Sequence, residues 1–245
     1  MSAGELLKRN FRQDITVEYK GEINPVTPLD LEAEKLIGDI LGSAFPSYGI
    51  LGEENHRRYQ RDDPYWIVDP LDGTTNYIRG YPLFAVSIAL QYHQQTLLGV
   101  VFSPILEDLY LATKGGGAFL NWQPIQVSKT QSLNQAVLAS GFPYNIRETE
   151  LDNIGQWAHL TRLIFSPRCD GCASLDLCFV ASGSYDGYWE LDLEAWDMAA
   201  GALIVSEAGG FATNVEGEGL DLFGRSIVAG NPAIHGQLLE RLRVV

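Results

Sequence analysis

Residues 66 to 77 constrain the fold of this chain most, because they join an apolar run directly to two acids, a proline and a glycine. The segment reads Trp-Ile-Val-Asp-Pro-Leu-Asp-Gly-Thr-Thr-Asn-Tyr. Ile67 and Val68 predict a buried strand, and Pro70 is expected to stop its hydrogen-bond ladder. Gly73 permits a positive φ or a close approach of the backbone to a ligand. We therefore expect a ligand site at the carboxyl end of a strand, where ligands collect in open α/β sheets.

Asp69 and Asp72 are the two acids of that segment, and Thr74 and Thr75 follow the glycine. Two carboxylates beside free N–H groups favour a hard cation and a phosphate group. The alternative is a turn in which Asp and Gly serve only local hydrogen bonds. The density of specific residues favours the binding site.

The net charge of −14 limits the partners of the chain. Nucleic acid and anionic membranes would be repelled, since the nearest approach to a basic run is Arg57, Arg58 and Arg61, interleaved with polar residues. A small phosphorylated substrate would be repelled as well unless divalent cations were bound. The alternative role of these acids is a solvated surface that aids solubility.

Length and composition predict one domain over residues 1–245, with subdomains at 1–130 and 131–245. The 245 residues are 46% hydrophobic, enough for a large core. No apolar stretch approaches the roughly 18 residues that span a bilayer, and the first ten residues lack the apolar centre of a signal peptide. Cytoplasmic residence is the expectation.

Three cysteines, Cys169, Cys172 and Cys178, are expected to be free thiols of a reducing compartment. The Cys-x-x-Cys pair has no second pair and no nearby histidine to complete a tetrahedral zinc site. His56, His93, His159 and His235 are scattered singly and are expected at surface or core positions.

The helix and strand patterns predict a mixed protein. Thr27-Pro28-Leu29-Asp30 resembles a capped helix start, and Gly42 is expected to end that helix. Asp197 falls in the first turn of a later helix, where the alternative role is a simple helix-start acid. We expect strands at 48–51, 66–68, 84–92, 97–102, 109–112 and 185–191, the third to fifth as an antiparallel meander, and further helices at 171–182 and 195–208.

Three blocks resemble the signature blocks of the inositol monophosphatase family of metal-dependent phosphatases. They are Gly52-Glu53-Glu54, the segment from Asp69 to Asn76, and Trp196-Asp197-Met-Ala-Ala-Gly201. Lys20 resembles part of that family's mobile loop, Asp30 its supporting acid, and Gly171-Cys172-Ala173 its substrate-binding turn. The resemblance runs from Ala3 onward. It implies an α/β protein, more closely a layered α+β fold with an alternating αβαβα sandwich, a homodimer, and inhibition by lithium.

The resemblance also implies roles for single residues. Glu53, Asp69 and the Leu71 carbonyl would hold one Mg²⁺, and Asp69, Asp72 and Asp197 another, in a site of two or three ions. Glu53 and Thr74 would orient the attacking water, with Asp30 as their partner behind. The N–H groups of Gly73 and Thr74 would bind phosphate. The alcohol would contact residues at the far side of the site, namely Asp72, Gly171, Cys172, Ala173, Glu190 and Asp197.

The ligand chemistry agrees with this on its own terms. Every proposed ligand is an oxygen, which selects Mg²⁺, with Mn²⁺ as a substitute, over zinc or copper. Two residues separate the acids of Asp69-Pro-Leu-Asp72, whereas the Asp-x-Asp-Gly-Thr pattern of haloacid dehalogenases has one. Direct attack by water is therefore favoured over an aspartyl-phosphate route.

Two features depart from the family pattern. Residues 1–10 are expected to be a shortened or truncated remnant of the family's first helix, and Cys172 stands where serine or threonine is common. The expected substrate is inositol 1-phosphate. Alternatives within the superfamily are fructose 1,6-bisphosphate, histidinol phosphate and a 3′(2′),5′-bisphosphate nucleotide, for which Arg79 and Arg168 are candidate rim residues. The non-enzymatic alternative is a regulatory or binding protein with a vestigial metal site.

Overall fold

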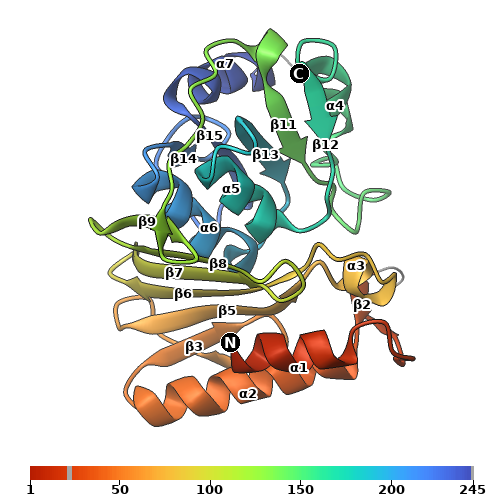
Figure 1. Cartoon of the computed structure of the whole chain (residues 1–245), viewed down its shortest axis with the longest axis vertical. Coiled ribbons are helices and arrows are strands. Elements are labelled where there is room, and N and C mark those ends of the chain that lie inside the picture. Colours follow the sequence, from red (N-terminus) through yellow and green to blue (C-terminus); the bar gives the residue numbers. More distant parts are fainter. Residues whose placement is uncertain (21–23, 244–245) are drawn as a thin grey trace.

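The computed structural model describes residues 1–20 and 24–243 as five stacked layers, helix, sheet, helix, sheet, helix (Figure 1). In the described residues, helices α1 (Ser2–Asn10) and α2 (Pro28–Ala44) cover the outer face of the first sheet. Helices α5 (Ala173–Ala181) and α6 (Ala195–Glu207) fill the space between the two sheets. Helices α4 (Ile154–Leu160) and α7 (Pro232–Leu242) cover the outer face of the second sheet. The predicted αβαβα sandwich is confirmed.

The first sheet has eight strands in the order β10-β9-β8-β7-β6-β5-β3-β4. Only the pair β3 and β5 is parallel, and the predicted antiparallel meander is confirmed as β6, β7 and β8. The strands are β3 (Gly49–Gly52), β4 (Arg57–Arg58), β5 (Tyr65–Asp72), β6 (Ala85–Tyr92), β7 (Gln95–Ser103), β8 (Asp108–Thr113), β9 (Gly117–Leu120) and β10 (Gln123–Pro124).

The second sheet has five strands in the order β12-β11-β13-β15-β14. These are β11 (Val137–Ser140), β12 (Ser166–Arg168), β13 (Gly187–Leu191), β14 (Phe211–Thr213) and β15 (Ser226–Gly230). A separate pair, β1 (Glu18–Lys20) and β2 (Asn24–Val26), lies beside the short helix α3 (Thr74–Ile78), and a 3-10 turn spans Leu133–Gln135. The division predicted near residue 130 falls between the two sheets and stays a prediction about folding units. No helix in the described part of the chain is long and apolar enough to cross a membrane.

Strand β5 is buried along its whole length and carries three of the predicted ligands, Asp69, Leu71 and Asp72. Pro70 interrupts the hydrogen-bond ladder with β6, but the strand does not end there, because β5 continues to Asp72. Its pairing with β6 shifts register instead, from Asp69 opposite Ser87 to Asp72 opposite Ala85. A proline has no N–H to donate, and a bulge accommodates it without ending the strand. The bulge lies between the two aspartates.

Helix α2 starts as predicted but ends later. Thr27 caps it, with the Asp30 carboxylate accepting from the Thr27 backbone N–H at 2.9 Å. The expectation that Gly42 ends the helix is wrong, since the helix runs to Ala44 and a side chain at Gly42 would meet nothing within 4 Å. Phe45 is the C-cap because it precedes Pro46, and a residue before proline avoids helical angles.

Three other predicted boundaries shift by two residues, one of them the start of β7, which begins at Gln95 rather than residue 97. Helix α5 begins at Ala173 because Gly171 has a φ of +72° and forms the preceding turn. Strand β13 begins at Gly187 rather than residue 185. Helix α6 begins at the predicted residue and ends at Glu207, one residue before the predicted end.

Candidate metal centre

Strands β3 and β5 bring the first two acids together. Because these strands are parallel neighbours, their carboxyl ends meet at one edge of the sheet, with Gly52 opposite Val68. The backbone N–H of Glu53 donates to the carbonyl of Val68 at 3.1 Å, which sets Glu53 beside Asp69. Helix α6 packs on the same sheet and brings Asp197 from the other half of the chain.

Asp69, Asp72 and Asp197 form the acidic cluster of the described residues. Carboxylate oxygens of these three residues all lie within 4.8 Å of one another. A backbone N–H orients each carboxylate: from Leu71 to Asp69 at 2.9 Å, from Ser174 to Asp72 at 2.7 Å, and from Glu194 to Asp197 at 2.8 Å. These donors give the cluster a defined geometry.

The electrostatics of the cluster fit a divalent cation. Burial raises the pKa of Asp69 well above its ordinary value, and the charges of Glu53 and Asp72 raise it further. Burial and the charge of Asp72 raise the pKa of Asp197 in the same way. Asp69 is only 2% exposed. Buried like charges at this distance are stable when a cation lies among them, and the all-oxygen donor set suits Mg²⁺.

Glu53 lies at the side of this cluster, where Lys20 meets it. The Lys20 ammonium is 3.4 Å from Glu53 Oε1 and 2.6 Å from Glu54 Oε1. Burial raises the pKa of Glu53 to about 7, and the nearby charge of Lys20 opposes that rise. Lys20 ends strand β1, and the residues that follow it in the predicted mobile loop, 21 to 23, lie outside the described part of the chain.

Thr74 and Asp30 form a buried pair behind the cluster. The Thr74 hydroxyl lies 3.2 Å from Asp30 Oδ1 and 3.0 Å from the Leu71 carbonyl oxygen. Asp30 Oδ2 also accepts from the Thr27 hydroxyl at 2.6 Å. Burial raises the pKa of Asp30, although these donors oppose the rise. The pair places a threonine hydroxyl, held by a carboxylate, beside the predicted ligand Leu71.

Gly73 forms the turn between the ligand strand and helix α3. Its φ is +87°, and a side chain there would approach the Leu83 carbonyl oxygen to 3.0 Å. Asn76, three residues on, donates to the carbonyls of Leu83 and Asp170, each at 2.7 Å. One amide thus ties this turn to the turn at Gly171, so the two predicted binding turns lie together.

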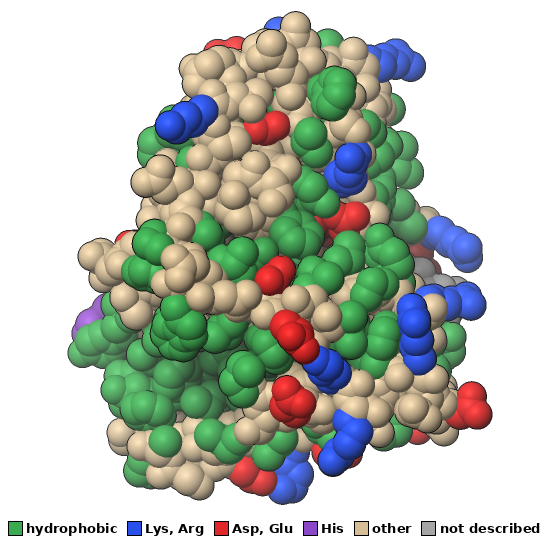
Figure 2. All heavy atoms as spheres, in the orientation of Figure 1, with side chains coloured by type: hydrophobic (Ala, Val, Ile, Leu, Met, Phe, Trp, Pro, Cys, Tyr) green, Lys and Arg blue, Asp and Glu red, His purple; other side chains and the backbone are tan. Residues whose placement is uncertain are grey.

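Cys172, Ala173 and Glu190 lie on the other side of Asp72. The Cys172 thiol donates to Asp72 Oδ2 at 3.1 Å, and Ala173 begins α5. Glu190, on β13, accepts a hydrogen bond from the Tyr188 hydroxyl. Burial raises the pKa of Glu190 to about 8, and the charge of Asp72 adds to this. Figure 2 shows several acidic side chains one below another from the upper to the lower half of the molecule, with a basic side chain beside the lower ones.

Glu34 is a site residue that the sequence interpretation missed. Its buried carboxylate accepts from the backbone N–H groups of Glu54, Asn55 and His56, at 2.7, 2.7 and 3.1 Å. A side chain at Gly52 would come within 2.3 Å of Glu34 Oε2. Glu34 therefore holds the loop that carries Glu53. Its position four residues after Asp30, on the same face of the helix, was the available signal.

Tyr144 is a second residue that was missed. Its hydroxyl lies 3.4 Å from Thr75 Oγ1. Tyr144 as a whole is 45% exposed. Desolvation of its hydroxyl beside the acids raises the pKa of Tyr144 to about 12, and the charges of Asp72 and Glu53 contribute. No local pattern identifies it, since it belongs to a loop distant in the sequence from the acids.

Comparison with known proteins gives the same assignment as the residues. The model of the "Inositol monophosphatase family" matches residues 1–244. The chain is 44% identical to an inositol-1-monophosphatase of Rhizobium meliloti over 97% of this chain and 91% of that one. It is 41% identical to a protein of Pseudomonas aeruginosa named Nus factor SuhB, over 99% and 92%. The solved structure of inositol monophosphatase from Anabaena superposes with a TM-score of 0.91 at 36% identity, covering 100% of this chain and 92% of that one.

The family match spans nearly the whole chain, and the three signature blocks converge at one edge of the first sheet. The chain belongs to the inositol monophosphatase family and is a phosphoric monoester hydrolase.

Proposed function

We propose that this protein hydrolyses the phosphate monoester of a small polyol, with inositol 1-phosphate as the first candidate, in a magnesium-dependent reaction. The observation that carries the proposal is the cluster of Asp69, Asp72 and Asp197, whose oxygens lie within 4.8 Å of one another beside the Gly73 turn. The relative of Rhizobium meliloti named inositol-1-monophosphatase supports the choice of substrate.

The acids are proposed to divide between two ions. Glu53, Asp69 and the Leu71 carbonyl would hold one, and Asp69, Asp72 and Asp197 the other, with Mn²⁺ as a substitute for Mg²⁺. Bound divalent ions supply charge neutralisation for the phosphate and the leaving alkoxide, and they lower the pKa of water. Inhibition by lithium is a further expectation.

Thr74 is proposed to orient the attacking water together with Glu53. Its hydroxyl proton is directed to Asp30 Oδ1 or to the Leu71 carbonyl, so its lone pairs are free to accept a proton from water in a hydrogen bond. The Thr27 donors hold the Asp30 carboxylate in place. Thr74 thus has a fixed orientation, which is what positioning a nucleophile requires.

The phosphate is proposed to lie against the N–H groups of Gly73 and Thr74. The first N–H groups of a helix have no acceptor within the helix, and the positive φ of Gly73 lets the backbone turn there. The alcohol would then extend toward Asp72, Ala173 and Glu190, past the turn at Gly171 and Cys172. Carboxylates suit this end because polyol hydroxyls are hydrogen-bond donors.

A substrate panel tests the proposal. Purified protein would be assayed for phosphate release from inositol 1-phosphate, fructose 1,6-bisphosphate, histidinol phosphate and adenosine 3′,5′-bisphosphate, with and without magnesium and with added lithium. We expect magnesium-dependent release, fastest from inositol 1-phosphate and suppressed by lithium. Fastest turnover of another panel member would reassign the substrate, and equal release without magnesium would refute the metal mechanism.

A regulatory role is the second candidate, since the Pseudomonas relative is named a Nus factor. A cytoplasmic location and a homodimer also stay expectations. The free thiols of Cys169, Cys172 and Cys178 support a reducing compartment. Sedimentation of the purified chain would test the homodimer.

A further inference from the structure

The segment after Glu53 crosses from the first sheet toward helix α6, and Arg57 is its point of contact. An Arg57 guanidinium N–H donates to the backbone carbonyl of Glu53 at 3.0 Å. The centre of the same guanidinium lies 4.7 Å from the centroid of the Trp196 ring. Trp196 directly precedes Asp197. One side chain therefore touches the backbone of one acid of the metal centre and the residue next to another.

These two acids need such a connection because they come from different elements. Glu53 follows strand β3, and Asp197 begins helix α6, about 140 residues later. Burial raises the pKa of Asp197, and the charge of Glu53 adds to the rise, so the two carboxylates repel each other when both are ionised. A planar guanidinium can donate to a carbonyl and stack on an indole at the same time. Arg57 joins the two elements from outside the cluster.

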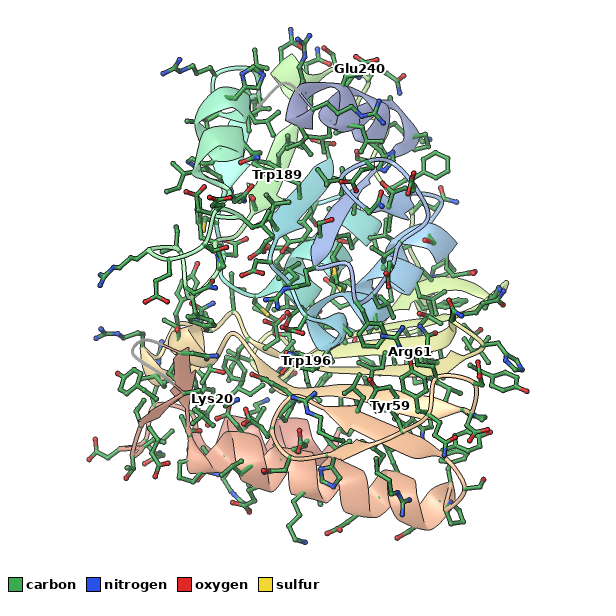
Figure 3. All side chains as sticks on the ribbon, turned by 180° about the vertical axis from the view of Figure 1, so that it is seen from behind. Lys20, Tyr59, Arg61, Trp189, Trp196 and Glu240 are labelled. Atoms are coloured by element: carbon green, nitrogen blue, oxygen red, sulfur yellow. The ribbon has the colours of Figure 1, made fainter. Side chains whose placement is uncertain are left out.

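Other contacts show that the Trp196 end of this connection is fixed. The Ser87 hydroxyl donates to the Trp196 carbonyl at 3.2 Å, which ties the start of α6 to strand β6. The ring of Tyr59 packs against the ring of Tyr65 on β5, with 4.8 Å between the ring centroids. Tyr59 therefore anchors the segment that carries Arg57 and Arg61 to the first sheet. In Figure 3, the labelled Tyr59, Arg61 and Trp196 lie in neighbouring parts of the structure, seen from behind.

Arg61 provides a matched comparison within the same segment. Its guanidinium centre lies 4.2 Å from the centroid of the Phe223 ring, a contact of the same kind as Arg57 with Trp196. Unlike Trp196, Phe223 is not adjacent in sequence to Glu53, Asp69, Asp72 or Asp197. Loss of either arginine removes one charge and one stacking contact, but only Arg57 touches Glu53.

We propose that Arg57 is a positioning residue that sets Glu53 against the start of helix α6 and thereby strengthens divalent cation binding. The inference rests on the proposed function, since it assigns Glu53 and Asp197 to a cation site. The alternative is that Arg57 only adds surface stability, as many exposed arginines do. The two differ in one respect. A positioning defect weakens Mn²⁺ binding at temperatures where the variant is fully folded, whereas a loss of stability alone lowers the melting temperature and leaves the Mn²⁺ affinity of the folded protein unchanged.

The experiment compares Arg57→Ala, Arg61→Ala and Arg57→Lys in the full-length chain. Mn²⁺ binding to metal-free protein would be measured by the electron paramagnetic resonance of free Mn²⁺, and thermal melting would be recorded for each variant. We expect Arg57→Ala to weaken Mn²⁺ binding by roughly tenfold, the lower end of the effect of losing an outer partner of a metal ligand. Arg61→Ala should bind Mn²⁺ as the parent does, and Arg57→Lys should fall between, since lysine keeps the charge but not the planar stack.

Activity against magnesium concentration gives the second readout. For Arg57→Ala we expect a roughly tenfold higher magnesium requirement, with kcat at saturating magnesium close to that of the parent. Equal Mn²⁺ affinity in Arg57→Ala and Arg61→Ala would overturn the inference, as would a loss of kcat that magnesium does not restore. Failure of the parent protein itself to bind Mn²⁺ would overturn the proposed function and this inference together, so the two failures are distinguishable.

Discussion

The proposed metal end and the proposed alcohol end of the site hold their carboxylates in different ways. At the metal end, backbone N–H groups orient Asp69, Asp72 and Asp197, and the three carboxylates approach within 4.8 Å. At the alcohol end, the Tyr188 hydroxyl donates to Glu190. The backbone donors fix the direction of the three carboxylates at the metal end, but the repulsion between their charges remains and a bound cation would reduce it. The tyrosine-bound Glu190, with a pKa of about 8, suits a neutral hydroxylated group.

The sharpest test of the metal end is Asp197→Asn. An amide keeps the shape of the carboxylate but removes its charge, so we expect kcat to fall by roughly a thousandfold while the protein stays folded. Phosphate release and circular dichroism would be measured together. Glu194→Gln, a change of the same kind at the cap of the same helix, is the control and should cost little. Full activity in Asp197→Asn would remove the distinction between the two ends.

Glu34→Ala should have the next largest effect at the metal end. The change leaves three backbone N–H groups of the Glu53 loop without their acceptor, so we expect the free energy of unfolding to fall by about 3 kcal/mol. Metal binding should weaken by roughly tenfold or more. Denaturant unfolding and Mn²⁺ titration would measure both. Glu32→Ala, an exposed acid on the same helix, is the control, and equal behaviour of the two variants would contradict the role of Glu34.

Glu190→Ala addresses the alcohol end. We expect KM for inositol 1-phosphate to rise by about tenfold with a smaller change in kcat, because one hydrogen bond to the alcohol is worth about 1.4 kcal/mol when its acceptor is charged or buried. Hydrolysis of p-nitrophenyl phosphate, which has no alcohol hydroxyls, should keep its KM. An equal loss of kcat/KM with both substrates would show that Glu190 serves the metal end instead.

The smallest expected effect is in thermal stability against pH. The folded-state pKa of Glu53 is about 7, above the ordinary 4.5, and those of Asp69 and Asp197 are also raised. At a pH between the unfolded-state and folded-state pKa values of these acids, the native state binds more protons than the unfolded state. Metal-free protein should therefore lose stability as pH rises from 5 to 7. We expect a fall of roughly 5 °C in Tm.

Magnesium should cancel most of that fall, because it binds the ionised carboxylates. A residual slope up to about pH 8 should remain from Glu190, and Glu190→Gln should remove it. Melting curves at pH 5.5, 7 and 8.5, with magnesium or with a chelator, would separate the two ends. Metal-free protein that gains stability between pH 5.5 and 7 would contradict this assignment.

Local patterns predicted the elements that carry the site. The Thr27 and Asp30 cap is a contact over three residues, and the apolar stripe of α6 placed Asp197 in its first turn. The errors are local too. Pro70 shifts the pairing of β5 with β6 without ending the strand, because pairing resumes at Asp72. Helix α2 ends at its C-cap Phe45, which precedes Pro46, and not at Gly42.

The sequence by itself determined which residue types the site contains, because the motif blocks are short-range properties, and the αβαβα class followed from the family resemblance that those blocks carry. Only the tertiary structure decided which side chains support the acids. Glu34 reaches a loop 20 residues away, and Arg57 meets Trp196 across the layers. Such contacts depend on how α2 and α6 pack against the first sheet, and no short stretch of chain contains both partners.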